Sequence, residues 1–68
     1  MNEENLNRTV RQFLKVVGVT SQREFENAVR QAVNSGRLRG DETLKAKAVM
    51  TLAGVDLRFE IDGEIKLA

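Results

Sequence analysis

Hydrophobic residues recur every three or four positions over the first half of the chain and every second position over the second half. The first spacing is typical of an amphipathic helix, and the second is typical of a β-strand with one covered face. The period changes at the segment 36–42, which is polar and contains two glycines. The pattern therefore predicts an α+β protein with a helical N-terminal part and an antiparallel sheet after it.

The N-terminal part is expected to form a helical hairpin over residues 2–35. The first helix spans about 2–17 and ends at Gly18, because a glycine after the last apolar position is a common C-terminal signal. The second helix begins at Ser21, which forms a capping box with Glu24. The apolar positions are Leu6, Val10, Phe13, Leu14 and Val17 in the first helix and Phe25, Ala28, Val29, Ala32 and Val33 in the second.

Residues 43–68 are expected to fold as a three-stranded antiparallel meander with one apolar face and one polar face. A four-residue loop at 53–56 pairs Leu52 with Leu57, and the alternation then keeps apolar residues opposite apolar residues. The further pairs in this register are Met50 with Phe59, Ala48 with Ile61, and Lys47 with Asp62.

The dipeptide Asp62-Gly63 predicts the second turn, because it is a strong signal for a two-residue hairpin loop. A two-residue loop places Ile65 and Leu67 on the polar face, whereas a three-residue loop with a left-handed Gly63 keeps them on the apolar face. Burial of these side chains favours the three-residue loop. The expected architecture is two helices packed on a three-stranded sheet, in the order α-α-β-β-β.

The composition excludes most kinds of active site. The chain has 68 residues, a net charge of +1, and no His, Cys, Trp, Tyr or Pro. Histidine and cysteine supply most acid–base, redox and zinc chemistry in proteins. The carboxylates lie in turns or alternate with apolar residues on strands, where we expect them to be exposed. We therefore predict no catalytic residue, metal ligand, cofactor or small-molecule substrate, and a protein that is not an enzyme.

The length indicates a single domain, 1–68, made of the helical hairpin 2–35, the linker 36–42 and the meander 43–68. A core of this size leaves little surplus stability, and small domains are often reinforced by disulfides, metals or a partner subunit. Because disulfides are excluded, we expect a homodimer that acts through protein–protein contact. Exchange of the helical part between two copies about the linker 36–42 is one way to form it.

Weak binding to nucleic acid is the alternative function. Four polar residues follow helical spacing opposite the apolar face of the predicted second helix, and arginine and asparagine are residue types that read base edges. The small net charge and the lack of interleaved aromatic residues argue against this interpretation, because any soluble amphipathic helix has a polar face. The four residues are Arg23, Asn27, Arg30 and Asn34.

No stretch of the sequence reaches the roughly 20 apolar residues that a membrane span needs. The sequence begins with an acidic segment, unlike the basic start of a secretory signal. We therefore expect a cytoplasmic protein with no membrane partner.

Three runs of the sequence carry a resemblance to known proteins: MNEENLNRTVRQFLKVVGVTSQREFENAVR, GRLRGDETLKAKAVMTL and GEIKL. Over nearly the whole chain they resemble a small family of uncharacterised bacterial proteins that share a domain of unknown function, and VGVTSQRE is the most specific stretch. The resemblance implies a bacterial cytoplasmic protein of the α+β class. It implies no activity, substrate or site residue.

Overall fold

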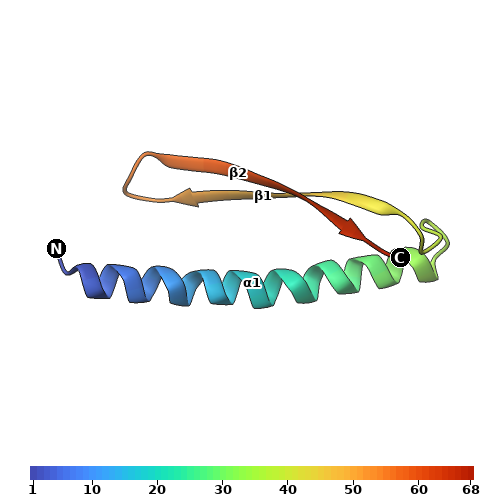
Figure 1. Cartoon of the computed structure of the whole chain (residues 1–68), viewed down its shortest axis with the longest axis horizontal. Helices are drawn as coiled ribbons and strands as arrows, with labels where there is room; N and C mark the ends of the chain where they lie inside the picture. The colour runs from blue at the N-terminus through green and yellow to red at the C-terminus, as the bar shows by residue number, and fades with distance from the viewer. The chain divides into compact units, whose positions relative to one another are not determined.

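The computed structural model describes residues 1–68 and contains one helix followed by a two-stranded antiparallel sheet (Figure 1). The α+β class is confirmed, but the expected order α-α-β-β-β is wrong because one helix and one strand fewer are present. The elements are α1 at Glu3–Asn34, β1 at Thr43–Leu52 and β2 at Leu57–Lys66.

Helix α1 begins close to the expected position. The side chain of Asn2 accepts a hydrogen bond from the backbone N–H of Asn5 (3.0 Å), which satisfies one of the free N–H groups of the first turn. Two glutamates lie in that turn, where the helix dipole favours negative charge. The helix ends at Asn34, and Gly36 follows in the left-handed region with φ +83°.

The expected break between two helices is wrong, because α1 runs through both Gly18 and Ser21. Gly18 does not take a positive φ, so it does not cap a helix. A glycine inside a helix costs only about 1 kcal/mol relative to alanine, whereas ending the helix would leave four C=O groups and, at a new start, four N–H groups without helical partners. No proline enforces a break, and the capping-box sequence therefore lies inside the helix.

Continuity of α1 joins the apolar positions of both halves into one row. Their spacings of four, four and three residues make an 11-residue repeat of about 3.67 residues per turn. This period is close to that of the α-helix, so the row stays on one side of α1 along its length. Its one polar member is Ser21. The row, here called the apolar stripe, consists of Leu6, Val10, Leu14, Val17, Ser21, Phe25, Ala28 and Ala32.

The sheet is a single β-hairpin in which a turn at residues 53–56 joins β1 to β2. Gly54 takes a φ of +91° in this turn, a conformation that glycine adopts without steric cost. The register expected for the turn is confirmed. It pairs Leu52 with Leu57, Met50 with Phe59, Ala48 with Ile61, and Lys47 with Asp62.

The expected third strand and its three-residue loop are wrong. Strand β2 continues through Asp62 and Gly63, and Gly63 lies opposite Ala46 without a positive φ. The unbroken strand preserves the alternation of faces, so Ile65 stays on the apolar face opposite Leu44. It also sets basic residues of β1 opposite acidic residues of β2, whereas the loop would have set two glutamates opposite each other. Long-range pairing therefore outweighs the local turn signal.

Replacing Gly18 with alanine is expected to raise the free energy of unfolding by about 0.5–1 kcal/mol. The residue is helical, and a Cβ at this position meets no atom within 4 Å. Urea denaturation of the full chain, followed by circular dichroism, measures the change. The matched control is Gly36→Ala, which should lower stability by about 1–2 kcal/mol because its φ is left-handed. Destabilisation by Gly18→Ala would contradict a continuous helix.

Candidate functional site

No residue of the chain is buried, and neither of its two compact units, Met1–Arg37 and Leu38–Ala68, has a core of its own. Large apolar side chains are exposed on both units. Scattered exposed apolar residues are ordinary on protein surfaces, but long contiguous apolar faces mark sites of interaction. The candidate functional surfaces are therefore the apolar side of α1 and the apolar face of the hairpin.

The middle of α1, residues 13–19, is apolar on more than one side. Phe13, Val16 and Val19 are 57%, 57% and 51% exposed. Because each residue turns a helix by about 100°, these three side chains cover about 120° of its circumference beside the apolar stripe. A helix that is apolar over so much of its circumference is normally covered from several directions. Helix α1 nevertheless lacks a stretch long and apolar enough to cross a membrane.

The hairpin places its apolar side chains on one face through the register of its two strands. A lone two-stranded hairpin is at best marginally stable in water, and it gains stability when its apolar face is covered or its sheet is extended. Ile61, near the centre of this face, is 57% exposed. The face consists of Leu44, Ala46, Ala48, Met50 and Leu52 from β1 and Leu57, Phe59, Ile61, Gly63 and Ile65 from β2.

The polar face of the hairpin holds ion pairs rather than a reactive group. Nζ of Lys47 lies 3.3 Å from Oε1 of Glu60, and Nη2 of Arg58 lies 2.9 Å from Oε2 of the same carboxylate. Exposed ion pairs of this kind contribute about 0–1 kcal/mol. No three residues among the aspartates and glutamates lie close enough together to hold a metal ion. The carboxylate of Glu60 on β2 is therefore shared between Lys47 of β1 and Arg58 of its own strand.

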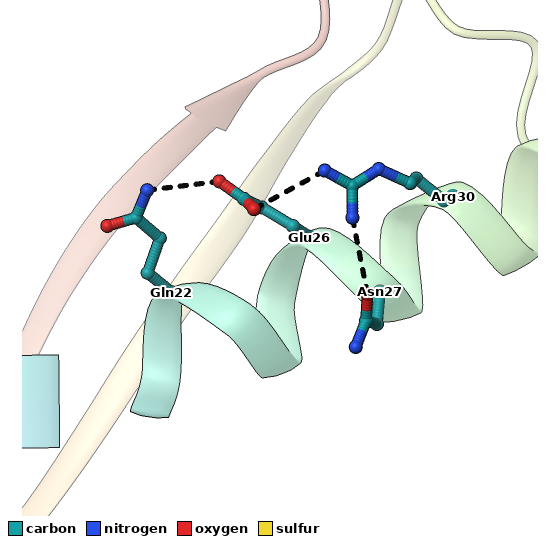
Figure 2. A network of polar contacts seen from close by, with 4 residues as sticks. All are labelled: Gln22, Glu26, Asn27 and Arg30. Atoms are coloured by element: carbon teal, nitrogen blue, oxygen red, sulfur yellow. Dashed lines mark hydrogen bonds and ion pairs between the residues drawn. The ribbon is translucent and has the colours of Figure 1, made fainter. Parts of the chain in front are cut away.

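The four residues of the nucleic-acid hypothesis, Arg23, Asn27, Arg30 and Asn34, lie on α1. Two of them, Asn27 and Arg30, already form hydrogen bonds with neighbouring side chains. Figure 2 shows the guanidinium of Arg30, which donates to Oδ1 of Asn27 (3.2 Å) and pairs with Oε1 of Glu26 (3.3 Å). Nε2 of Gln22 donates to the other oxygen of Glu26 (3.0 Å). The carboxylate places a negative charge beside the four residues, which opposes binding to phosphate.

Glu26 is a partner of Arg30 that was not predicted from the sequence. The hydrogen bond from Gln22 lowers the pKa of Glu26 below its ordinary value of 4.5, and Arg30 adds a smaller lowering through its hydrogen bond and its charge. Partial desolvation of the Glu26 carboxylate acts in the opposite direction and is larger than either effect of Arg30, but smaller than the effect of Gln22. Residues four apart on a helix are neighbours, so the spacing of Gln22, Glu26 and Arg30 is the signal that could have found this network.

A second group that the sequence analysis missed is Glu42, at the end of the segment between α1 and β1. Its carboxylate accepts hydrogen bonds from the backbone N–H groups of Arg39 (2.8 Å), Gly40 (2.9 Å) and Asp41 (3.2 Å). Gly40 takes a φ of +108°, which favours glycine. The N–H of Arg39 is the largest of the hydrogen-bonding effects that hold the pKa of Glu42 below 4.5. The carboxylate therefore gives residues 39–42 a defined turn.

The comparison with known families identifies the chain's relatives. A family of unknown function (DUF6494) matches residues 1–68, the whole length of the chain. The chain belongs to this family. The family resemblance inferred from the sequence is thereby confirmed, and the family's description assigns no activity. None of the curated proteins and none of the solved structures compared with the chain matches it.

Stability is expected to depend on pH through Glu42. Its pKa is lower in the folded chain than the ordinary 4.5, so the hydrogen bonds to the carboxylate stabilise the fold fully above pH 4.5 and are lost as the pH falls through the lowered value. Urea denaturation of the unmodified chain and of Glu42→Gln at several pH values isolates this contribution. The unmodified chain should be the more stable at neutral pH, and the difference should shrink in acid.

An independent check is an NMR titration of the Glu42 carboxyl group. The amide resonances of Arg39 and Gly40 should shift with the same midpoint, below pH 4.5. A stability difference that stays constant down to pH 2 would contradict the role given to the carboxylate.

Proposed function

We propose that this protein is not an enzyme and that it acts through protein–protein contact, with a second copy of itself as its first partner. The observation that carries the proposal is that no residue is buried, although both units present continuous apolar faces. Each Å² of apolar surface removed from water contributes about 25 cal/mol of favourable free energy. A homodimer covers such surfaces without requiring any other molecule.

The non-enzymatic part of the proposal is supported by what the polar groups do. The chain has no His or Cys, and the carboxylates of Glu26, Glu42 and Glu60 are each held by hydrogen bonds or ion pairs on an open surface. General acids and nucleophiles need an enclosed environment that perturbs their reactivity. The polar groups here stabilise a helix side, a turn and a strand pair.

The apolar residues of α1 support self-association most directly. Phe13, Val16 and Val19 lie beside the apolar stripe and widen the apolar part of α1 beyond the roughly 100° that one packing partner covers. A second packing partner therefore stabilises the helix further. Exchange of units between two copies about residues 36–42 is one form of such a dimer. It is supported by the division into two compact units at Arg37 and Leu38, because a segment that joins two separate units is where copies can exchange them.

Multi-angle light scattering should give a mass twice the 7.6 kDa of one chain at concentrations of high micromolar order. Replacing Phe13 with serine should weaken the dimer at least about 10-fold, because burial of one phenylalanine contributes roughly 1.5–3 kcal/mol in each copy. Arg11→Gln is the control, because Arg11 lies on the part of the helix circumference that neither the apolar stripe nor Phe13, Val16 and Val19 occupy, and it should leave the dissociation constant within about threefold of the unmodified value. A monomeric mass at every concentration would contradict the proposal.

Nucleic-acid binding through Arg23, Asn27, Arg30 and Asn34 remains the alternative. One observation favours this function. Because α1 is continuous, basic residues of both halves lie on the side opposite the apolar stripe, among them Arg8 and Arg30. The exposed Val16 and Val19 and the ion-paired Glu26 interrupt that side, which is why we place this function second.

Fluorescence anisotropy with mixed-sequence duplex and single-stranded DNA tests the alternative at about 50 mM and 200 mM salt. We expect no binding tighter than about 10⁻⁴ M at the higher salt, the weak end of non-specific binding. The double variant Arg23→Ala with Arg30→Ala should then behave as the unmodified chain does. Binding that falls steeply with salt and is weakened by the double variant would favour the alternative.

A further inference from the structure

The hairpin leaves one edge of β1 and one edge of β2 without a neighbouring strand. The N–H of Leu67 donates to the C=O of Glu42 (3.0 Å), so these two residues form a hydrogen-bonded pair at the end of the ladder. Hydrogen-bonded and non-hydrogen-bonded pairs alternate along an antiparallel ladder. The backbone groups that face outward therefore belong to Thr43, Lys45, Lys47, Val49 and Thr51 on β1 and to Arg58, Glu60, Asp62, Glu64 and Lys66 on β2.

The carboxylates of β2 oppose its pairing with β2 of a second copy. Two identical strands related by a two-fold axis pair antiparallel, and the register is defined by the residue on which the pairing is centred. A pairing centred on Glu60, Asp62 or Glu64 places that carboxylate opposite the same carboxylate of the second copy. Centring on residue 61 or 63 places two neighbouring carboxylates opposite each other. Like charges directly opposite are destabilising, so the central registers of β2 are disfavoured.

On the corresponding edge of β1, the longest register that avoids this repulsion is centred on Ala48 and pairs residues 44–52, whereas a register centred on Val49 also avoids it but pairs only residues 46–52. Centring on Lys45, residue 46 or Lys47 sets two lysines opposite each other, but centring on Ala48 sets Lys47 opposite Val49 instead. Val49 is 50% exposed and is an aliphatic residue on an otherwise polar face. In this register the other outward pair is Lys45 with Thr51, and the apolar face continues with Ala46 opposite Met50 and Leu44 opposite Leu52.

We propose that two copies of this chain join edge to edge through β1, centred on Ala48, and form one four-stranded antiparallel sheet. This inference rests on the proposed self-association and adds an edge-to-edge contact between the hairpins to the contact proposed through α1. The pairing covers residues 44–52 of each copy and merges the apolar faces of two hairpins into one. The outer edges of the sheet are the two β2 strands, whose carboxylates resist further symmetric pairing. A sheet of four strands also meets the size that independent stability requires.

A competing arrangement pairs β1 of one copy with β2 of the next. Lysines then face carboxylates, as they do within the hairpin, but the arrangement repeats and has no closed end. Its mass grows with concentration, whereas the β1–β1 interface closes at two copies. Light scattering therefore separates the two arrangements.

Proline substitution tests the interface in the full chain. Val49→Pro removes an outward N–H from the centre of the proposed pairing in both copies and leaves the ladder of the hairpin intact, since proline is tolerated at a sheet edge. The loss of two hydrogen bonds between the copies should weaken the dimer about 10-fold or more. Asp62→Pro removes an outward N–H from the β2 edge and should leave the dissociation constant within about twofold of the unmodified value.

Disulfide formation gives a second readout that does not depend on the proline variants folding. The chain has no cysteine of its own. In the proposed register Ala48 lies opposite its own copy in a non-hydrogen-bonded pair, where the Cα atoms are about 4.5 Å apart and a disulfide fits. Ala48→Cys should give a covalent dimer under mild oxidation. Ile61→Cys, at the residue that faces Ala48 on β2, is the matched control and should stay uncrosslinked.

The outcomes separate the two proposals. A monomeric mass for the unmodified chain overturns both of them. A dimer that survives Val49→Pro, or that crosslinks through Ile61→Cys and not through Ala48→Cys, leaves the proposed function standing and overturns the β1 interface. A mass that rises steadily with concentration also overturns it, in favour of β1 pairing with β2.

Discussion

The register in which Leu52 faces Leu57 is the constraint on which the rest of the hairpin depends. Because side chains alternate between the two faces of a strand, this one pairing decides which residues form the apolar face and which form the polar face. Because hydrogen-bonded pairs alternate in the same way, it also decides which backbone groups face the open edges. If one strand shifted by one residue relative to the other, its apolar side chains would all move to the polar face of the hairpin.

Continuity of α1 has a comparable effect on the helical unit. One helix through Gly18 places the apolar positions of both halves in a single row with an 11-residue repeat, where two helices would have divided that row between separate axes. It also brings a broad apolar surface, from Phe13 to Val19, into the middle of the helix. Both units thus present apolar surface that is not buried in a core of their own, and this is the observation on which we base the proposed self-association.

The parts of the fold that the sequence predicted correctly are those in which two independent signals agree. At residues 53–56 the turn length and the alternation of faces select the same register, and that register is observed. At Gly18 and at Asp62-Gly63 a local turn or cap signal predicted a break, but the periodic pattern of apolar residues continued past it. The structure shows a continuous helix at Gly18 and a continuous strand at Asp62-Gly63. The carboxylate contacts of Glu42 could not be predicted, because they depend on how the backbone folds back toward one side chain.

The sequence by itself determined the α+β class, the apolar and polar alternation, and a composition without the usual reactive side chains. These follow from periodicity and residue chemistry, which need no knowledge of distant contacts. The three-dimensional structure decided the number of elements, because the stability of a helix turn or a strand pair depends on the hydrogen bonds that continue on either side of it. It also fixed which charged residues lie along each edge of the hairpin, because the residues that face an edge are known only once the register is known.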